Sequence, residues 1–154
     1  MAKARRQSNN TITGIQTDIS ACVEGIGPLG SDGIESDLTT GTEVIDTAGA
    51  MSSSLVFTCP PGQGGRYFVA GVIEFNGSFS GDESCFIRIK KNGVTKTTGW
   101  GGSATANVEI GAQVMTLLDL VPGDTVTFSK RWNGISSASI NGSVSIFKLT
   151  GTAA

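Results

Sequence analysis

Hydrophobic and polar residues alternate with a period of two along most of the chain. The clearest run is RYFVAGVIEF, residues 66–75, in which Tyr67, Ile73 and Phe75 fall on one face. A period of two predicts a β-strand, because successive side chains of a strand point to opposite faces. The other face of this run is largely apolar too, which fits a strand packed between the core and a subunit interface.

A second run, CFIRIKK, alternates Ile87 and Ile89 with the cations Arg88 and Lys90. The Asn-Gly pair that follows is typical of a type I′ hairpin turn, because both residues tolerate positive φ. Turn signals recur every 8–12 residues, which predicts about eight strands and an all-β sandwich or jelly roll. The remaining strands are expected at residues 42–47, 54–59, 94–99, 112–120, 125–132 and 143–151.

Three segments rich in glycine and serine interrupt these runs and predict loops. They are NGSFSGDES at residues 76–84, GWGGSATANVEIG at 99–111 and NGISSASING at 133–142. Since none of them alternates clearly, each is expected to connect two separate strands.

Residues 1–40 differ in texture from the rest of the chain, because they are polar and rich in glycine. Isolated isoleucines occur there, and three of them have helical spacing, but their neighbours disfavour a helix. Such a segment buries too little apolar surface to order itself. We therefore expect residues 1–40 to form an extended arm held by a partner, and residues 41–154 to form the jelly-roll head.

The composition supports one all-β domain with many turns, since 22 of the 154 residues are glycine and 16% are charged. A formal net charge of −2 disfavours a nucleic-acid partner. The chain has no apolar run long enough for a membrane span. The basic start MAKARR is followed by the polar QSNNTITG, so we expect no secretion signal and assembly in the host cytoplasm.

The inventory of reactive residues argues against an enzyme. Without histidine, the chain has no Ser–His or Cys–His pair. Cys22, Cys59 and Cys85 are widely spaced and lack a CxxC motif, which excludes a typical zinc site, and no cofactor is expected. Cys59 and Cys85 are either buried free thiols or a pair joined across neighbouring strands.

One hairpin carries four cations, for which two interpretations stay open. They form either a patch for an anionic partner, such as lipopolysaccharide or an acidic capsid surface, or a solvated strand face whose lysines discourage aggregation. These cations are Arg88, Lys90, Lys91 and Lys96.

The two tryptophans are equally open. Trp100 and Trp132 each lie beside a glycine-rich segment. Each is either an interface anchor or a lid on the core.

The strands from Phe57 onward resemble the globular head of complement component 1q. FTCPPGQGGRYFVAG is similar to the opening strand of that family, with about three extra residues before Tyr67, and SCFIRIKKNG is similar to its next strand. NGSVSIFKLTG resembles the closing strand loosely, because Lys148 follows Phe147. The hairpin AQVMTLLDLVPGDTVTFS matches the family in order at Leu118, Leu120, Gly123, Asp124 and Val126.

The resemblance covers residues 57–150 and implies a jelly roll of the complement 1q and tumour necrosis factor type. It implies a compact trimer that binds other molecules without performing chemistry. Some heads of this type hold calcium through loop carboxylates, for which Asn76, Asp82 and Glu83 are candidates; a solvated loop is the alternative. The chain lacks a collagen-like stalk and a secretion signal, which favours a bacteriophage virion over a complement role.

From this resemblance we expect a homotrimeric capsid decoration, or cement, protein of a virion, with the major capsid protein as its partner. The arm is expected to attach it to neighbouring capsid subunits. The residues expected to make that attachment are Lys3, Arg5, Arg6, Ile12 and Ile15.

The trimer interface is expected to use large aromatic residues of the strand at residues 66–75 and of the last strand. They are Tyr67, Phe68, Phe75 and Phe147. The alternative function is a receptor- or carbohydrate-binding knob at the tip of a phage or bacterial fibre. Residues 1–40 show neither heptads nor repeats, so decoration is favoured over a fibre tip.

Overall fold

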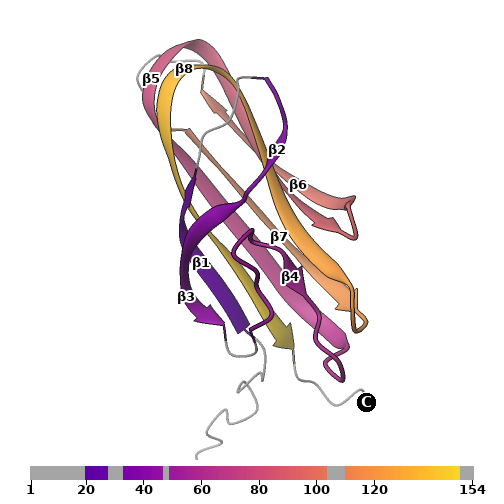
Figure 1. The fold of residues 1–154 in the computed structure, drawn as a ribbon. Helices are drawn as coiled ribbons and strands as arrows, with labels where there is room; N and C mark the ends of the chain where they lie inside the picture. The colour runs from indigo at the N-terminus through magenta and orange to yellow at the C-terminus, as the bar shows by residue number, and fades with distance from the viewer. Residues whose placement is uncertain (1–19, 28–32, 47–48, 104–109, 150–154) are drawn as a thin grey trace, which may run out of the picture.

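All regular structure in the described part of the chain is antiparallel β-sheet. The computed structural model describes residues 20–27, 33–46, 49–103 and 110–149 (Figure 1). The strands are β1 (Ser20–Gly27), β2 (Ser36–Asp37), β3 (Thr40–Asp46), β4 (Phe57–Thr58), β5 (Gly65–Lys91), β6 (Val94–Ser103), β7 (Ile110–Leu120) and β8 (Thr125–Leu149).

The two long strands, β5 and β8, run side by side and bend together, so that each contributes to two sheets (Figure 1). The first sheet has the order β3, β1, the C-terminal half of β8, the N-terminal half of β5, and β7. In the second sheet, the other halves of β8 and β5 pair with each other, β2 and β4 pair with β8, and β6 pairs with β5. This two-sheet arrangement is the predicted jelly roll.

The core lies between the two sheets, and the alternation of residues along β5 explains which of its side chains enter the core. Tyr67, Ile73 and Phe75 are fully buried, as their spacing predicts. Phe75 packs against Trp132 with ring centroids 5.6 Å apart, and Tyr67 packs edge-on against Phe57 at 5.7 Å. Bulky side chains from both sheets therefore fill the interior.

One charged residue, Lys130, interrupts this apolar interior. It lies on β8 between the buried Phe128 and Trp132 positions of the same face, and only 1% of its surface is exposed. Burial lowers the pKa of its ammonium group, while the nearby Asp37 opposes that change. The sequence gives no sign of this burial, because lysine almost always stays at the surface.

Strands β6 and β7 approach each other unusually closely where the two sheets meet. A Cβ atom added to Gly99 would lie 1.7 Å from the carbonyl oxygen of Gln113, and one added to Gly101 would lie 1.7 Å from that of Gly111. Any side chain at these positions would overlap the β7 backbone. The GWGGS segment was predicted to be irregular, but residues 99–103 belong to β6 because glycine permits this approach.

The β5–β6 hairpin turns as predicted. Asn92 and Gly93 have φ values of 51° and 76°, which the Asn-Gly pair adopts readily. Lys91 and Val94 are cross-strand partners on either side of the turn. The prediction of this hairpin is confirmed.

The expected loops at residues 76–84 and 133–142 are instead the bends of β5 and β8. Their backbones pair with each other, with Asn76 opposite Ser139 and Ser78 opposite Ser137. The pairing is irregular around Phe79, where the register shifts. Two segments with turn-like composition therefore form strands because each supplies the hydrogen-bonding partner of the other.

The expected arm also differs from the structure in its described part. β1 lies between β3 and β8, and β2 pairs with β8 at Ser129 and Lys130. Residues 20–27 and 36–37 are therefore part of the sheets rather than of an extended arm. The three isoleucines with helical spacing lie in residues 12–19, outside the described residues.

Candidate oligomer interface

The outer face of the first sheet carries a cluster of exposed apolar side chains. Phe68 of β5 is the cross-strand partner of both Leu117 of β7 and Phe147 of β8, so the three form one row across the sheet. In the next row Ala70 lies between Met115 and Ser145. We call this surface the apolar face; it comprises Phe68, Ala70, Val72, Met115, Leu117, Phe147 and Leu149.

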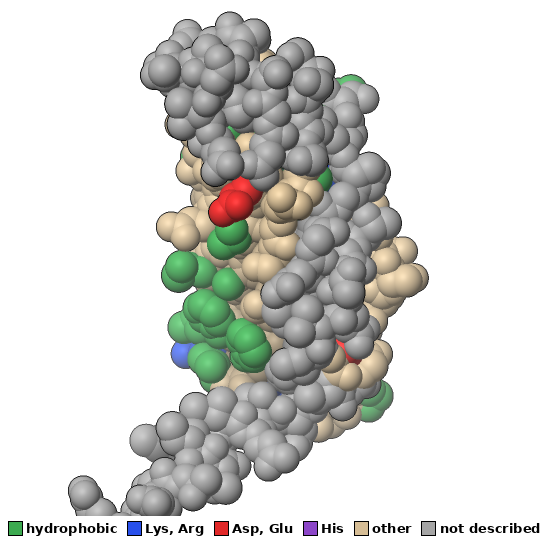
Figure 2. Space-filling model, turned by 90° about the vertical axis from the view of Figure 1, so that its left-hand side faces the viewer, with side chains coloured by type: hydrophobic (Ala, Val, Ile, Leu, Met, Phe, Trp, Pro, Cys, Tyr) green, Lys and Arg blue, Asp and Glu red, His purple; other side chains and the backbone are tan. Residues whose placement is uncertain are grey.

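Much of the apolar face is open to solvent in the single chain. Met115 is 59% exposed, Leu117 54% and Leu149 44%. Figure 2 shows hydrophobic side chains gathered on this side of the molecule, with charged side chains beside them. At the lower rim, Arg66 makes a two-pronged ion pair with Asp119 at 2.8 and 3.0 Å. A contiguous apolar surface with a polar rim is typical of a protein–protein interface.

The sequence places these side chains outward through the alternation of β7. In IGAQVMTLLDL the buried positions include Val114, Leu118 and Leu120, and Met115 and Leu117 fall between them. A strand with water on one side normally alternates apolar with polar residues. In β7 the outward positions 115 and 117 are apolar instead, and no described residue covers Met115 or Leu117.

Two of the four predicted interface residues belong to the apolar face and two do not. Phe68 and Phe147 lie side by side there. Tyr67 and Phe75 are fully buried between the sheets, so they cannot face another subunit and that part of the prediction is corrected. The Tyr67 hydroxyl is held inside by donating a 2.6 Å hydrogen bond to the carbonyl of Gln63.

The sequence analysis did not identify Met115, Leu117 and Leu149 as members of an exposed apolar surface. The signal was present in the second apolar face of residues 112–120, which matches that of residues 66–75. The residues predicted to attach to a capsid, Lys3, Arg5, Arg6, Ile12 and Ile15, lie outside the described residues.

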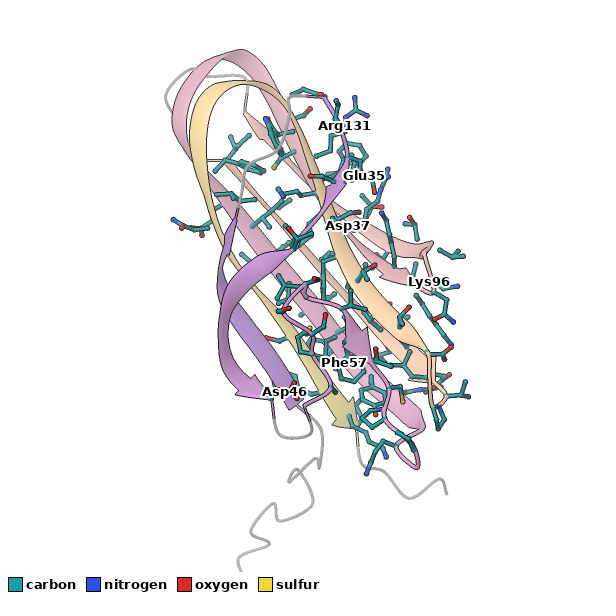
Figure 3. The ribbon with its side chains drawn as sticks, in the orientation of Figure 1. Glu35, Asp37, Asp46, Phe57, Lys96 and Arg131 are labelled. Carbon is teal, nitrogen blue, oxygen red and sulfur yellow. The ribbon has the colours of Figure 1, made fainter. Side chains whose placement is uncertain are left out.

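The outer face of the second sheet is largely polar, and Arg88 and Lys90 on it are paired with acidic residues. Glu35 accepts a hydrogen bond from Arg88, a 3.1 Å contact from Lys90 and a 2.6 Å bond from the Ser129 hydroxyl. Lys90 also contacts Asp37 at 3.1 Å. Burial would raise the pKa of Glu35, but Ser129 and the two cations outweigh it and hold that pKa below its usual value. Figure 3 shows Glu35 and Asp37 together on β2 and its approach.

These ion pairs bear on whether the cations of the β5–β6 hairpin form a patch for an anionic partner. Arg88 and Lys90 are neutralised by Glu35 and Asp37, and Lys91 contacts Asp124 at 2.7 Å. Lys96 is exposed. The hairpin is therefore largely a paired strand surface rather than a concentrated patch of positive charge.

Asp124 ties the β5–β6 and β7–β8 hairpins together. Its carboxylate accepts bonds from Lys91, from the backbone N–H of Val121 at 2.8 Å and from the Asn92 amide at 2.6 Å. The Lys91 bond is the largest cause, followed by the other two, of a pKa lowered to about 2. The Gly-Asp pair of the resemblance thus has a structural role here.

The two tryptophans have different environments, which resolves the alternatives for each. Trp132 is 1% exposed and packs against Phe75 in the core. Trp100 is 65% exposed on the outside of β6. Trp132 therefore belongs to the core, while Trp100 is available to a partner.

The thiols of Cys59 and Cys85 are not joined in a disulfide. Cys59 and Cys85 are both buried and free. Burial raises the pKa of Cys85 to about 11, so its thiol stays protonated at neutral pH. The disulfide alternative therefore does not hold.

No metal-binding cluster of acidic or cysteine side chains occurs among the residues that the structure describes. The candidate calcium ligands Asn76, Asp82 and Glu83 lie in the bend of β5, and their side chains are outside the described set. Nor do the described ranges contain a helix long and apolar enough to cross a membrane.

Comparisons with known proteins identify the fold. No family model matches the chain, and no curated protein matches it. Two solved structures share the fold: the globular domain of zebrafish complement 1qA protein, with a TM-score of 0.62 and 14% identity, and PRD1 vertex protein P5, with a TM-score of 0.65 and 13% identity. Each alignment covers 87% of this chain and 99% of the other.

The chain is therefore an all-β jelly roll of the complement 1q and tumour necrosis factor type. This confirms the fold that the motifs from Phe57 onward implied. At 13–14% identity the likeness defines the fold, and function depends on the surfaces that this fold carries.

Proposed function

We propose that this protein is a non-enzymatic structural component of a virion, specifically a homotrimeric capsid decoration protein. Its N-terminal residues attach it to neighbouring capsid subunits. The observation that carries this proposal is the apolar face on a jelly roll similar to that of a vertex protein.

The apolar face supports self-association. Burying a large apolar side chain contributes about 1.5–3 kcal/mol, so covering Met115, Leu117 and Phe147 outweighs a modest ordering cost. A three-fold ring requires each face to meet a different surface of the next copy. The complement 1q resemblance favours three copies over two, and icosahedral shells offer three-fold positions to such a ring.

The likeness to PRD1 vertex protein P5 supports a virion setting, since a vertex protein is a component of a particle. The described residues carry paired charges and buried thiols rather than an exposed reactive group, which favours a binding role over catalysis.

The N-terminal segment is proposed as the capsid attachment. Its first six residues include Lys3, Arg5 and Arg6, and apolar contacts from Ile12 and Ile15 would follow. Three linked segments in one trimer gain avidity, so each needs only a weak contact.

The first test is the native mass of the full chain by analytical ultracentrifugation. Three copies of the 15.8 kDa chain give about 47 kDa. A species of that mass at micromolar concentration supports the trimer. A monomer that persists at the highest soluble concentration contradicts it.

The second test separates attachment from assembly. A variant lacking residues 1–19 is co-expressed with the major capsid protein of the virion proposed as its partner, and the particles are sedimented. We expect the truncated head to keep the native mass but to stay in the supernatant, while the full chain pellets. A truncated head that pellets as fully as the full chain would refute the role of the arm.

A second candidate function, a receptor- or carbohydrate-binding knob, is favoured by one observation. Trp100 is exposed beside a small pocket on the outer face of the second sheet. It also lines a second hollow together with Val72 of the apolar face, so the two candidate surfaces adjoin at this ring.

A further inference from the structure

A small pocket opens on the outer face of the second sheet, where three strands lie in register. Trp100, Phe86 and Arg131 form one row, and Gly102, Ser84 and Asn133 form the next. The small residues Gly102 and Ser84 leave space beside the large side chains of the first row. The pocket is lined by Ser84, Cys85, Phe86, Trp100, Arg131 and Asn133.

The aromatic wall of this pocket is fixed in position. Phe86 is 3% exposed, because Trp100 packs edge-on against it at 5.1 Å and the guanidinium of Arg88 stacks over its ring at 4.1 Å. The Trp100 ring is held at one edge while most of its surface stays open. A rigid, exposed aromatic ring suits a flat apolar surface of a ligand.

Arg131 supplies a cation without an acidic partner among the described residues. Its Nε atom is buried and has no hydrogen-bond acceptor. Its guanidinium contacts the Asn133 side chain at 3.5 Å, which is a long hydrogen bond. The nearby carboxylate of Glu35 is already engaged by Arg88, Lys90 and Ser129. Figure 3 shows Arg131 near the same end of the sheet as Glu35.

The remaining polar groups can recognise hydroxyls. The Asn133 amide donates a 3.2 Å hydrogen bond to the Ser84 hydroxyl, so both side chains are oriented at the pocket. Together they leave an amide oxygen and a hydroxyl group that accept or donate further bonds.

We propose that this pocket binds a carboxylate-bearing sugar residue. The planar guanidinium of Arg131 matches a carboxylate, Ser84 and Asn133 match sugar hydroxyls, and Trp100 matches the apolar face of a pyranose ring. The pocket has a volume of about 70 Å³. This is well below the roughly 300–1,000 Å³ of pockets that enclose drug-sized ligands, so the pocket takes the carboxylate of a terminal sugar residue while the ring lies across the exposed Trp100.

The proposal does not depend on the virion role or on the trimer. A protein that failed to trimerise or to bind capsids would still be expected to bind the sugar, because the pocket is built from one chain.

The test is a titration of the full chain with three small probes, followed by calorimetry and by NMR shifts of the Trp100 indole N–H and the Asn133 amide. The probes are methyl β-D-glucuronide, the neutral methyl β-D-glucoside and acetate. We expect the glucuronide to bind at least about 10-fold more tightly than either other probe, because it alone satisfies both parts of the pocket.

Two variants localise the binding. Arg131→Gln and Trp100→Ala are each expected to weaken glucuronide binding about 10-fold or more. Lys96→Gln is the matched control, since it removes the same charge from an exposed position of β6 outside the pocket, and it should bind like the parent. Arg131→Lys tests geometry, because it keeps the charge but loses the planar fork. The native mass of each variant is measured in parallel.

The outcomes discriminate clearly. Glucuronide binding that is lost in Arg131→Gln and kept in Lys96→Gln supports the proposal. Acetate binding as tight as glucuronide binding overturns the sugar assignment in favour of a simple anion site. Absence of glucuronide binding by the folded parent, or unchanged binding in Arg131→Gln, overturns the site itself. Loss of the native mass in Trp100→Ala would assign Trp100 to subunit contact instead.

Discussion

The two outer faces of the sandwich have opposite chemistry although the same alternation produces both. On the first sheet, the outward positions of β5, β7 and β8 carry exposed apolar side chains such as Met115 and Leu117. On the second sheet, the outward positions carry Arg88 and Lys90, which are paired with acids that β2 and its approach bring to them. Most charges of the second face are paired within the described residues, whereas the apolar side chains of the first face are uncovered by any described residue. This difference is why we propose the first face as the one that another copy covers.

The largest effect is expected from a charge placed on the apolar face. Leu117→Glu puts a carboxylate beside Phe68 at the β7 end of the row that Leu117, Phe68 and Phe147 form, where covering it would leave it without a partner. We expect the 47 kDa species (three times 15.8 kDa) to fall to the mass of one chain. Native mass and circular dichroism check the result together, since the fold should be kept.

Thr95→Glu is the matched control for Leu117→Glu, because Thr95 is exposed on β6 of the second sheet. It adds the same charge and should leave the mass unchanged. If Leu117→Glu keeps the parent mass, the apolar face is not the subunit contact.

The next effect concerns the edge at which the two sheets meet. Gly99→Ala forces a methyl group against the carbonyl oxygen of Gln113, so β6 and β7 must separate. We expect a loss of about 2–4 kcal/mol in the free energy of unfolding, measured by urea denaturation. Gly93→Ala is a useful comparison, because nothing lies within 4 Å of the added atom there, although its φ of 76° still costs some strain. Equal losses in the two variants would contradict the close approach.

A smaller effect is expected on the paired polar face. Glu35→Ala removes the acceptor shared by Arg88, Lys90 and Ser129, and these groups are about a quarter exposed or less. We expect a loss of about 1–2 kcal/mol in unfolding free energy. Asp37→Ala, at a side chain that is 55% exposed, should cost about 0.5 kcal/mol or less. If Asp37→Ala costs more than Glu35→Ala, the ranking by burial is wrong.

The smallest effect is a dependence on acid. The pKa of Asp124 is about 2 in the folded chain, below its usual 3.8. A lowered pKa stabilises the fold above the unfolded value, and this stabilisation is lost as the pH falls through the folded value. The urea midpoint of the parent should therefore fall between about pH 4 and pH 2.

Asp124→Asn isolates this contribution. In this variant the urea midpoint should be lower than that of the parent at pH 7. It should also decrease less than that of the parent as the pH falls from about 4 to about 2. An acid profile that is the same in the parent and the variant would show that other carboxylates govern the decline.

Much of the architecture followed from the sequence where the pattern was local. The alternation of residues 66–75 identified a strand with two apolar faces, and the Asn-Gly pair identified the hairpin. The bends of β5 and β8 did not follow, because glycine and serine read as turns until their distant partner is known. The strand β1 was not predicted for the same reason. Its local sequence does not show that it pairs with the distant β8.

The candidate site was half predicted. Phe68 and Phe147 of the apolar face were named in the prediction because they are large aromatic residues. Tyr67 and Phe75 were assigned to the same surface, although an odd-numbered position of β5 lies on the opposite face of the strand from Phe68, and both are buried. Arg131 went unnoticed as a binding residue. Arg131 is a candidate binding residue only because no described acidic side chain pairs with it. The nearby Glu35 pairs with Arg88 and Lys90 instead, and the sequence does not show this.

The paired bend of β5 and β8 has a consequence for how the chain folds. Residues near 66 pair with residues near 149, and residues near 91 pair with residues near 126, so the same two strands pair in both sheets, with register shifts on either side of Phe79. Neither sheet can form until the last strand has been synthesised, and such distant pairing makes folding slow. The protein should therefore fold as one cooperative unit, and loss of the last ten residues of β8 should abolish folding rather than trim an edge.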